Sequence, residues 1–271
     1  MRGAVIHAPG DVRVEERENP TIVAPTDAII RVSAACVCGS DLWDYRGINE
    51  VTQPTPMGHE YVGVVTEIGE LVKNIAVGDF VVGSFFASDN TCEICEAGYQ
   101  SRCAHVEYVG AGGAQAEYVR VPLADGTLVA TPGTPDDDLI PSLLAASDVL
   151  GTGRFGAVAA EAGPGKTVVV VGDGAVGLLA VLAAKQLGAE RIIAMSRHES
   201  RQKLAREFGA TDIVTERGDE GVARVKELTG GYGAHSVIEA VGTPDDAGHP
   251  LHPPRWTRGI RGCGPRGGAS R

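Results

Sequence analysis

The amino-acid sequence predicts an α/β protein in which a β-rich domain precedes a domain built around a parallel sheet. Apolar residues make up 43% of the 271 residues and mean hydropathy is close to zero, as in globular chains with a substantial core. Short segments of alternating apolar and polar residues recur up to about residue 125. From about residue 140, strand-like and helix-like segments alternate instead, which indicates βαβ units.

The β-rich part is marked by apolar segments that Gly, Pro, Asn and Asp separate. Its clearest strand-like segments are DAIIRVSAAC, YVGVVTEIG, DFVVGSF and AEYVRVP. An Ala/Leu-rich stretch with an acidic start, at 136–162, predicts a pair of helices after these strands. We therefore expect a first domain over residues 1–150.

The parallel sheet is predicted from four strand patterns, separated by helical patterns. The strand patterns are TVVVVG, RIIAMS, ATDIV and SVIEAVG. The alternation stops after Gly242, and we expect a second domain over residues 151–244.

Charge and composition narrow the classes of partner. The formal net charge is −11 and the pI about 5.1, which argues against nucleic acid or an anionic membrane as the main partner. The sequence has no run of about 18 apolar residues and no apolar leader, so we expect neither a membrane span nor a secretory signal. We expect a cytoplasmic location, where the six cysteines are first considered as metal ligands, catalytic thiols or core residues.

A glycine motif, VVVVGDGAVG, follows the first strand of the second domain and begins a helix. Gly172 permits a tight turn, Gly174 lets the backbone approach a pyrophosphate, and Gly177 lets the helix pack closely on the strand. Ala175 and Val176 complete the motif at a helix N-terminus that faces the anion. The spacing predicts a dinucleotide site; the alternative is a glycine-rich turn without a ligand.

The end of the second strand indicates which dinucleotide binds. NAD-binding proteins usually have Asp or Glu there, to hold the ribose 2′-hydroxyl. Here Ser196 and Arg197 occupy that place, followed by His198. A hydroxyl and a guanidinium can bind a 2′-phosphate, so we expect NADP(H), with NAD(H) as the second possibility. In the alternative interpretation Arg197 is solvated and Glu199 binds the ribose.

Two further motifs, CVCGSD and GHE, contain a thiolate, an imidazole and a carboxylate, a ligand set suited to zinc. With the glycine motif, and in this order, they resemble the zinc-dependent alcohol dehydrogenases of the medium-chain dehydrogenase/reductase superfamily over residues 1 to about 244. The resemblance implies a GroES-like zinc-binding catalytic domain over 1–150 and a Rossmann NAD(P)-binding domain over 151–244. It also implies hydride transfer between a small-molecule alcohol and NAD(P), or the reverse with an aldehyde or ketone.

The resemblance assigns Cys38, His59 and Asp148 as ligands of a catalytic zinc. Glu60 matches a carboxylate that enters the zinc shell when water or substrate exchanges. The GTG that follows Asp148 fixes its alignment with the third zinc ligand of the family. The alternative is that Asp148 is a solvated charge on a helix. We expect Cys36, in the same motif, to face away from the metal, as a core residue.

Further roles follow from the same resemblance. Ser40 matches a hydroxyl that passes the alcohol proton outward; the alternative is a plain turn residue. Asp41 matches a carboxylate that orients the zinc-bound histidine. Thr152 matches a residue beside the nicotinamide. Trp43 stands where relatives often have a proton-relay histidine, so we expect the proton to leave by another route.

A second cysteine motif, SDNTCEICEAGYQSRC, resembles the four-cysteine lobe that binds structural zinc in many members of this superfamily. Cys92, Cys95 and Cys103 match three of its ligands. Asp89 stands where the lobe has its first cysteine, and Asp is an established zinc ligand. We expect a structural zinc held by these four residues; the alternative is a lobe that has lost its metal.

The last residues, 245–271, form a tail that is rich in Pro, Gly and Arg and has no strand or helix period. The resemblance implies further strands here, which in many relatives build the interface of a homo-oligomer. Permitted codons for 245–271, read one base later, can spell a helix, an RPGG turn and a Gly/Val strand. We interpret the tail as a shifted reading frame in preference to a natural short variant, and the Rossmann domain as incomplete at its C-terminal end.

The sequence is therefore compatible with two functions. The first is an NADP(H)-preferring, zinc-dependent alcohol dehydrogenase. The alternative is an inactive remnant that binds zinc and weakly binds nucleotide without turnover. A zinc-free quinone reductase is disfavoured, because Cys38, His59 and Asp148 occur together.

Overall fold

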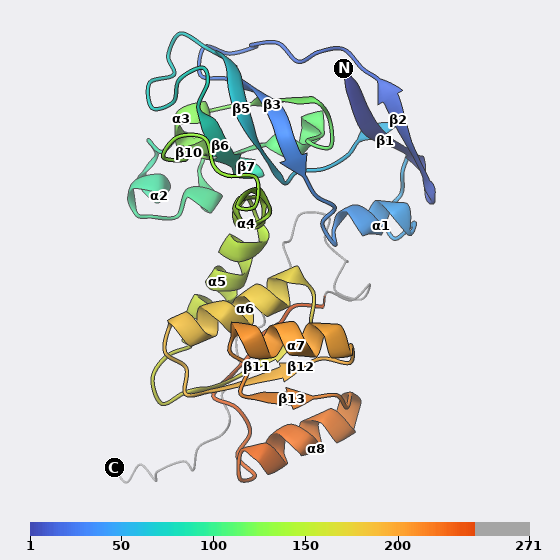
Figure 1. Ribbon diagram of the computed structural model, residues 1–271, viewed down its shortest axis with the longest axis vertical. Helices are drawn as coiled ribbons and strands as arrows, with labels where there is room; N and C mark the ends of the chain where they lie inside the picture. Colours follow the sequence, from blue (N-terminus) through green and yellow to red (C-terminus); the bar gives the residue numbers. More distant parts are fainter. Residues whose placement is uncertain (242–271) are drawn as a thin grey trace, which may run out of the picture. The chain divides into compact units, whose positions relative to one another are not determined.

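The change in sequence pattern near residue 140 corresponds to a division of the chain into two units (Figure 1). The structure is a computed structural model that describes residues 1–241. The first unit spans Met1–Asp148, and the second begins at Val149. The tail over 245–271, and with it the interpretation as a shifted reading frame, lies outside the described residues.

The first unit is built from antiparallel sheets, as its alternating segments predict. Its five-stranded sheet has the order β10-β6-β5-β3-β9, and all neighbouring strands are antiparallel. Ile30, Tyr61 and Val119, from three of these strands, are buried in one core. The strands are β3 (Ala28–Ala35), β5 (Tyr61–Ile68), β6 (Phe80–Gly83), β9 (Tyr118–Val121) and β10 (Leu128–Ala130).

Smaller sheets and short helices complete the first unit. One sheet has the order β2-β1-β4, and β7 pairs with β8 in another. The remaining strands are β1 (Arg2–Ala8), β2 (Asp11–Glu16), β4 (Thr55–Pro56), β7 (Phe86–Ala87) and β8 (Glu107–Tyr108). The helices are α1 (Asp41–Tyr45), α2 (Glu93–Glu96), η1 (Gln100–Arg102), η2 (Val109–Gly112), α3 (Ala124–Thr127) and α4 (Ile140–Ala146).

The second unit contains a parallel sheet with the order β13-β12-β11-β14. Its strands are the predicted ones, and all neighbours are parallel, which confirms the α/β class. The strands are β11 (Thr167–Val171), β12 (Arg191–Met195), β13 (Asp212–Val214) and β14 (Ser236–Glu239). The helices are α5 (Val149–Ala159), α6 (Ala175–Gln186), α7 (Glu199–Phe208) and α8 (Gly218–Leu228).

Helices cover both faces of this sheet, which explains why the central residues of its strands are apolar on both sides. Val168 and Val170 of β11 pack with residues of α6 and α7 on one face. Val169, between them, packs on the opposite face with Val225 and Leu228 of α8. The carboxyl ends of the strands are thereby fixed side by side, beside the glycine motif that follows β11.

Asp27 is a buried charge in the first unit. Its carboxylate accepts hydrogen bonds from the backbone N–H groups of Val23 (2.9 Å) and Ala24 (2.8 Å) and pairs with Arg120 (2.6 Å). Burial by itself would raise the pKa of Asp27, but Arg120 and the two backbone groups lower that pKa below its ordinary value. Asp27 therefore stays ionised and joins the loop before β3 to β9.

We expect the substitution Asp27→Asn to lower the free energy of unfolding by about 2–4 kcal/mol at pH 7, because it leaves Arg120 without its counter-charge. Since the folded pKa lies below the unfolded one, this stabilisation is present above about pH 4 and is lost as the pH falls through the folded value. Urea unfolding at pH 7 and pH 3 measures both effects. Asp11→Asn, which breaks an exposed pair with Arg13, is the control and should change little. A loss that is equal at both pH values would contradict the prediction.

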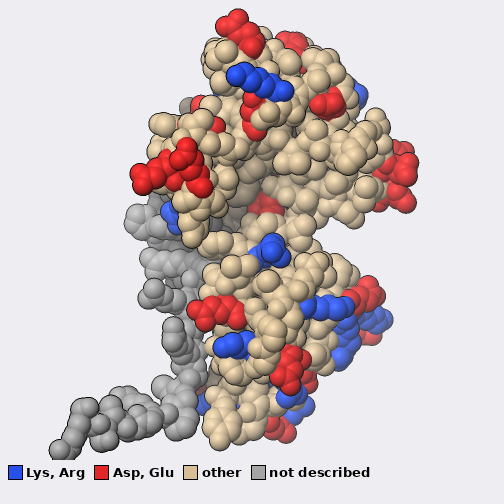
Figure 2. Space-filling model, turned by 90° about the vertical axis from the view of Figure 1, so that its left-hand side faces the viewer, with Lys and Arg blue, Asp and Glu red and all other residues tan. Residues whose placement is uncertain are grey.

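The surface shows charges of both signs. On the face in Figure 2, acidic side chains are spread widely, and basic side chains lie among them without forming a continuous patch. None of the helices in residues 1–241 is long and apolar enough to cross a bilayer.

Candidate functional site

Four predicted metal ligands come together in the first unit. Cys38 lies in the loop between β3 and α1, His59 and Glu60 directly precede β5, and Asp148 follows α4. One donor atom from each residue lies within 4.8 Å of the others. His59 and Glu60 are buried, and the Asp148 side chain is 10% exposed. Residues far apart in the sequence thus form one compact group of thiol, imidazole and carboxylates.

His59 is held at both ring nitrogens. Nδ1 lies 3.4 Å from an Asp41 carboxylate oxygen, and Nε2 lies 3.4 Å from Oδ2 of Asp148. The second Asp41 oxygen accepts a hydrogen bond from the Cys38 backbone N–H (2.9 Å). Burial opposes a charge on the ring, but Asp148, Asp41 and Cys38 together raise the pKa of His59 well above its ordinary value. Asp41 thus fixes the ring so that Nε2 faces the other candidate ligands.

Glu60 supplies the observation that favours a cation at this place. Its side chain is almost fully buried, and its Oε1 atom has no hydrogen-bond partner in the described part of the chain. Burial, together with the nearby Asp148 carboxylate, raises the pKa of Glu60. A buried carboxylate oxygen without a partner is costly, and a divalent cation would satisfy it. The donor set and this oxygen fit a zinc ion.

The expectation that Cys36 faces away from this group as a core residue is wrong. Its thiol donates a hydrogen bond to Oε2 of Glu60, and burial with the neighbouring carboxylate raises the pKa of Cys36 to about 12. The expectation misapplied strand alternation, because residues two apart in an extended segment face the same side, which places Cys36 on the side of Cys38. Gln115 was not identified from the sequence; its amide donates to the Cys36 carbonyl (3.2 Å) and to Asp41 (3.1 Å).

Three other residues that were assigned a role near the reaction are not members of this group of metal ligands. Ser40 is exposed at the start of α1, and its side chain makes no capping hydrogen bond. Trp43 lies within α1. Thr152 lies in α5 of the second unit.

A second group of metal-binding side chains lies in the segment from Asp89 to Cys103. The donor atoms of Asp89, Cys92, Cys95 and Cys103 are all within 4.8 Å of one another. The Cys92 sulfur is 3.4 Å from that of Cys95 and 4.0 Å from that of Cys103. Thiolates around a tetrahedral zinc at about 2.3 Å are separated by roughly 3.8 Å, so this spacing fits zinc and is too long for a disulfide.

Backbone groups prepare these sulfurs for a metal. The N–H groups of Ala104 and His105 donate to the sulfurs of Cys92 (3.4 Å) and Cys103 (3.3 Å). Hydrogen bonds from Ala104 and other groups lower the pKa of Cys92 to about 7. His105, which sequence reasoning missed, places Nδ1 2.5 Å from Oδ2 of Asp89. The other Asp89 oxygen lies 3.2 Å from the Cys103 sulfur.

The glycine motif forms the predicted turn between β11 and α6. Gly172 has a φ of +108°, a conformation that favours glycine. A Cβ on Gly177 would lie 2.2 Å from the Gly172 carbonyl oxygen, so helix and turn can pack only with glycine here. A Cβ on Gly174 would meet no atom within 4 Å, so the backbone at the start of α6 is open to a ligand.

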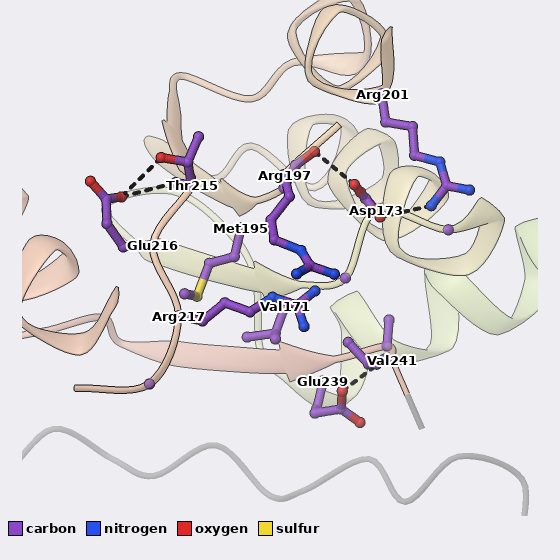
Figure 3. A pocket seen from close by; sticks show the side chains of 15 residues that line it. Val171, Asp173, Met195, Arg197, Arg201, Thr215, Glu216, Arg217, Glu239 and Val241 are labelled. Carbon is purple, nitrogen blue, oxygen red and sulfur yellow. Dashed lines mark hydrogen bonds and ion pairs between the residues drawn. The ribbon is translucent and has the colours of Figure 1, made fainter. Parts of the chain in front are cut away.

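A cavity of about 460 Å³ lies at the carboxyl ends of the strands of the second unit (Figure 3). Among the predicted cofactor residues, Gly172, Gly174, Ser196 and Arg197 line it. Ala175 and Val176, in the first turn of α6, do not, and neither does Thr152. Asp173, Arg201, Glu216, Arg217 and Glu239 also line the cavity and were not identified from the sequence.

Ser196 has a partner within the protein. Its hydroxyl donates to Oδ2 of Asp173 (2.8 Å). Arg201 pairs with the other Asp173 oxygen (2.9 Å). Glu199, the alternative ribose ligand, is exposed beside Lys203 (3.4 Å) and is absent from the described lining of the cavity. The carboxylate near the end of β12 therefore comes from the glycine motif.

Comparisons with known proteins cover both units. Residues 24–132 match the alcohol dehydrogenase GroES-like domain, and residues 175–248 match the zinc-binding dehydrogenase family. The chain is 41% identical over 255 residues to a medium-chain reductase/dehydrogenase of an Acremonium species, with 89% of this chain and 86% of the relative covered. It is 40% identical over 252 residues to zinc-type alcohol dehydrogenase B of Aspergillus flavus, with 89% and 58% covered. An alcohol dehydrogenase structure from Thermus sp. ATN1 is 36% identical, with a TM-score of 0.79 and 90% and 71% covered.

The comparisons agree with the two folds described above. The β-rich unit corresponds to the GroES-like domain, and the parallel sheet corresponds to the Rossmann-type domain. The chain spans 58% of the length of the Aspergillus relative and 86% of the Acremonium relative. The chain belongs to the zinc-dependent alcohol dehydrogenases of the medium-chain dehydrogenase/reductase superfamily.

Proposed function

We propose that this protein transfers a hydride between a small-molecule alcohol, or the corresponding aldehyde or ketone, and NAD(P). The observation that best supports this is the group of Cys38, His59, Glu60 and Asp148, in which His59 and Glu60 are buried and one Glu60 oxygen has no hydrogen-bond partner in the described part of the chain. Zinc, when bound by these residues, would act as a Lewis acid that lowers the pKa of an alcohol or polarises a carbonyl. A cytoplasmic location is consistent with the five free cysteines of residues 1–241.

Residues of the chain itself orient the metal ligands and carry the proton. Asp41 holds the His59 ring, so that Nε2 is presented to the group. Cys36 binds one oxygen of Glu60 and leaves Oε1 for the cation. Ser40, exposed next to Asp41, is assigned to pass the alcohol proton outward, with no histidine at Trp43 to receive it.

We assign NADP(H) as the preferred cofactor. In Figure 3 the side chains of Arg197 and Arg217 extend into the cavity, and neither forms an ion pair with another described residue. Guanidinium groups bind phosphate through paired hydrogen bonds, so these two arginines can receive a 2′-phosphate. Ser196 acts by holding Asp173.

Fluorescence titration of the zinc-loaded protein is expected to give a Kd for NADPH at least about tenfold below that for NADH, because one charged hydrogen bond contributes more than about 1.4 kcal/mol. Turnover of an alcohol and aldehyde panel should show the same preference. Arg197→Gln should reduce it, whereas Lys203→Gln, on the exposed side of α7, should not. A Kd for NADH equal to or below that for NADPH would refute the assignment. Binding of zinc and nucleotide without turnover would support the inactive remnant instead.

A further inference from the structure

We propose that the ion pair between Asp173 and Arg201 determines how strongly the cavity distinguishes NADPH from NADH. In this proposal the Asp173 carboxylate disfavours a 2′-phosphate, and Arg201 offsets that carboxylate and offers its remaining N–H groups to the phosphate. The inference rests on the proposed function, because it takes the cavity of the second unit as the nucleotide site.

The position of Asp173 makes it a specificity residue. It lies between Gly172 and Gly174, in the turn that follows β11, yet its carboxylate reaches the end of the neighbouring strand β12 through Ser196 (2.8 Å). In sheets of this kind, a carboxylate at the end of the second strand contacts the ribose 2′-hydroxyl of NAD. Here the strand has no acidic residue at that point, and the carboxylate is contributed by the preceding turn.

Asp173 is charged at neutral pH. Burial disfavours the ionised form, but the Ser196 hydroxyl and the Arg201 guanidinium lower the pKa of Asp173 below its ordinary value. A fixed negative charge beside an incoming 2′-phosphate weakens NADPH binding, and it leaves NADH, which has a neutral hydroxyl there, less affected.

Arg201 has N–H donors that its ion pair with Asp173 does not use. The pair with Asp173 uses Nη1 (2.9 Å), and the Arg201 side chain is 50% exposed while that of Asp173 is 15% exposed. A guanidinium has five N–H donors, so it can keep the carboxylate and also bind a phosphate. Figure 3 shows Arg201 on the α7 side of Asp173, so that α7 supplies the charge that this turn requires.

The test is a double-mutant cycle with Arg201→Gln, Asp173→Asn and both together, using NADPH and NADH. Adenosine 2′,5′-bisphosphate and 5′-AMP serve as second probes, because they need only the adenosine half of the site. We expect Arg201→Gln to weaken NADPH and the bisphosphate about tenfold to a hundredfold, and NADH and AMP less than about threefold. Asp173→Asn should strengthen NADPH several-fold, and in the double variant the loss should be smaller than for Arg201→Gln alone.

Arg206→Gln, on the same helix but outside the described lining of the cavity, is the matched control and should leave all four affinities unchanged. Equal effects of Arg201→Gln on phosphorylated and unphosphorylated nucleotides, or an unchanged affinity ratio in Asp173→Asn, would overturn the inference. If the wild-type protein prefers NADH, the assignment of NADP(H) is refuted. The inference about Asp173 and Arg201 would still stand, provided that the two variants change the ratio of the NADPH and NADH affinities as stated. Wild-type protein that binds neither nucleotide would overturn both.

Discussion

Replacement of Cys38 with alanine is expected to remove one of two zinc ions per chain and to lower kcat/KM at least about a thousandfold, because a Lewis acid contributes several kcal/mol to such a reaction. The thiol of Cys38 is one of four donors at this place, and zinc retains three or four protein ligands in known catalytic and structural sites. Metal analysis and steady-state kinetics on the same preparation measure both effects. Circular dichroism checks that the first unit keeps its sheets.

Comparing activity with secondary structure in this variant distinguishes a catalytic metal from a structural one. Cys38 lies in a loop outside the five-stranded sheet, so the variant should keep its secondary structure while it loses activity. His59→Gln, which removes the ligand that Asp41 orients, should give the same result. A Cys38→Ala protein that keeps two zinc ions, or keeps activity within about tenfold, would show that this thiol is not a ligand of the catalytic metal.

Much of the fold could be predicted because its signals are local. The run of valines in β11 and the alternation of strands and helices predict a parallel sheet without reference to distant residues. The turn at Gly172 and Gly177 could also be predicted locally, because the spacing of the two glycines within one motif identifies the role of each. Candidate metal ligands were found by their motifs and, for Asp89 and Asp148, by the family resemblance, and the structure brings each predicted set together.

The contacts that tune these sites could not be predicted from local patterns. Gln115 reaches Cys36 across 79 positions of the sequence, and Arg201 reaches Asp173 across 28. Such contacts depend on how strands and helices pack, and no spacing rule relates the residues. Cys36 is a different case: the local rule for extended segments already places it on the side of Cys38, and only its contact with Glu60, 24 positions away, is beyond local patterns. His105 beside Asp89 is a third case.

The second large effect is expected for Cys95→Ala, which should remove the other zinc ion and destabilise the lobe from Asp89 to His105. Cys95 is 3% exposed, and burial raises the pKa of its thiol to about 12, so without a metal this lobe would contain a buried protonated thiol beside two other sulfurs. A structural zinc contributes many kcal/mol of folding energy, and we expect the midpoint of thermal unfolding to fall by about 10 °C or more. Differential scanning calorimetry, zinc analysis and limited proteolysis of the lobe measure this.

Graded substitutions then identify the fourth ligand. Asp89→Ala should weaken zinc binding more than His105→Ala, for which about tenfold to a hundredfold is expected, because His105 contacts the carboxylate and Asp89 would contact the metal. Ile94→Ala changes an exposed residue of the same helix α2 and should retain both zinc ions. If His105→Ala weakens zinc binding more than Asp89→Ala, the histidine is the ligand and the carboxylate only orients it. Wild-type protein with one zinc ion per chain, bound at Cys38, would instead mean that the lobe holds three reduced thiols and no metal.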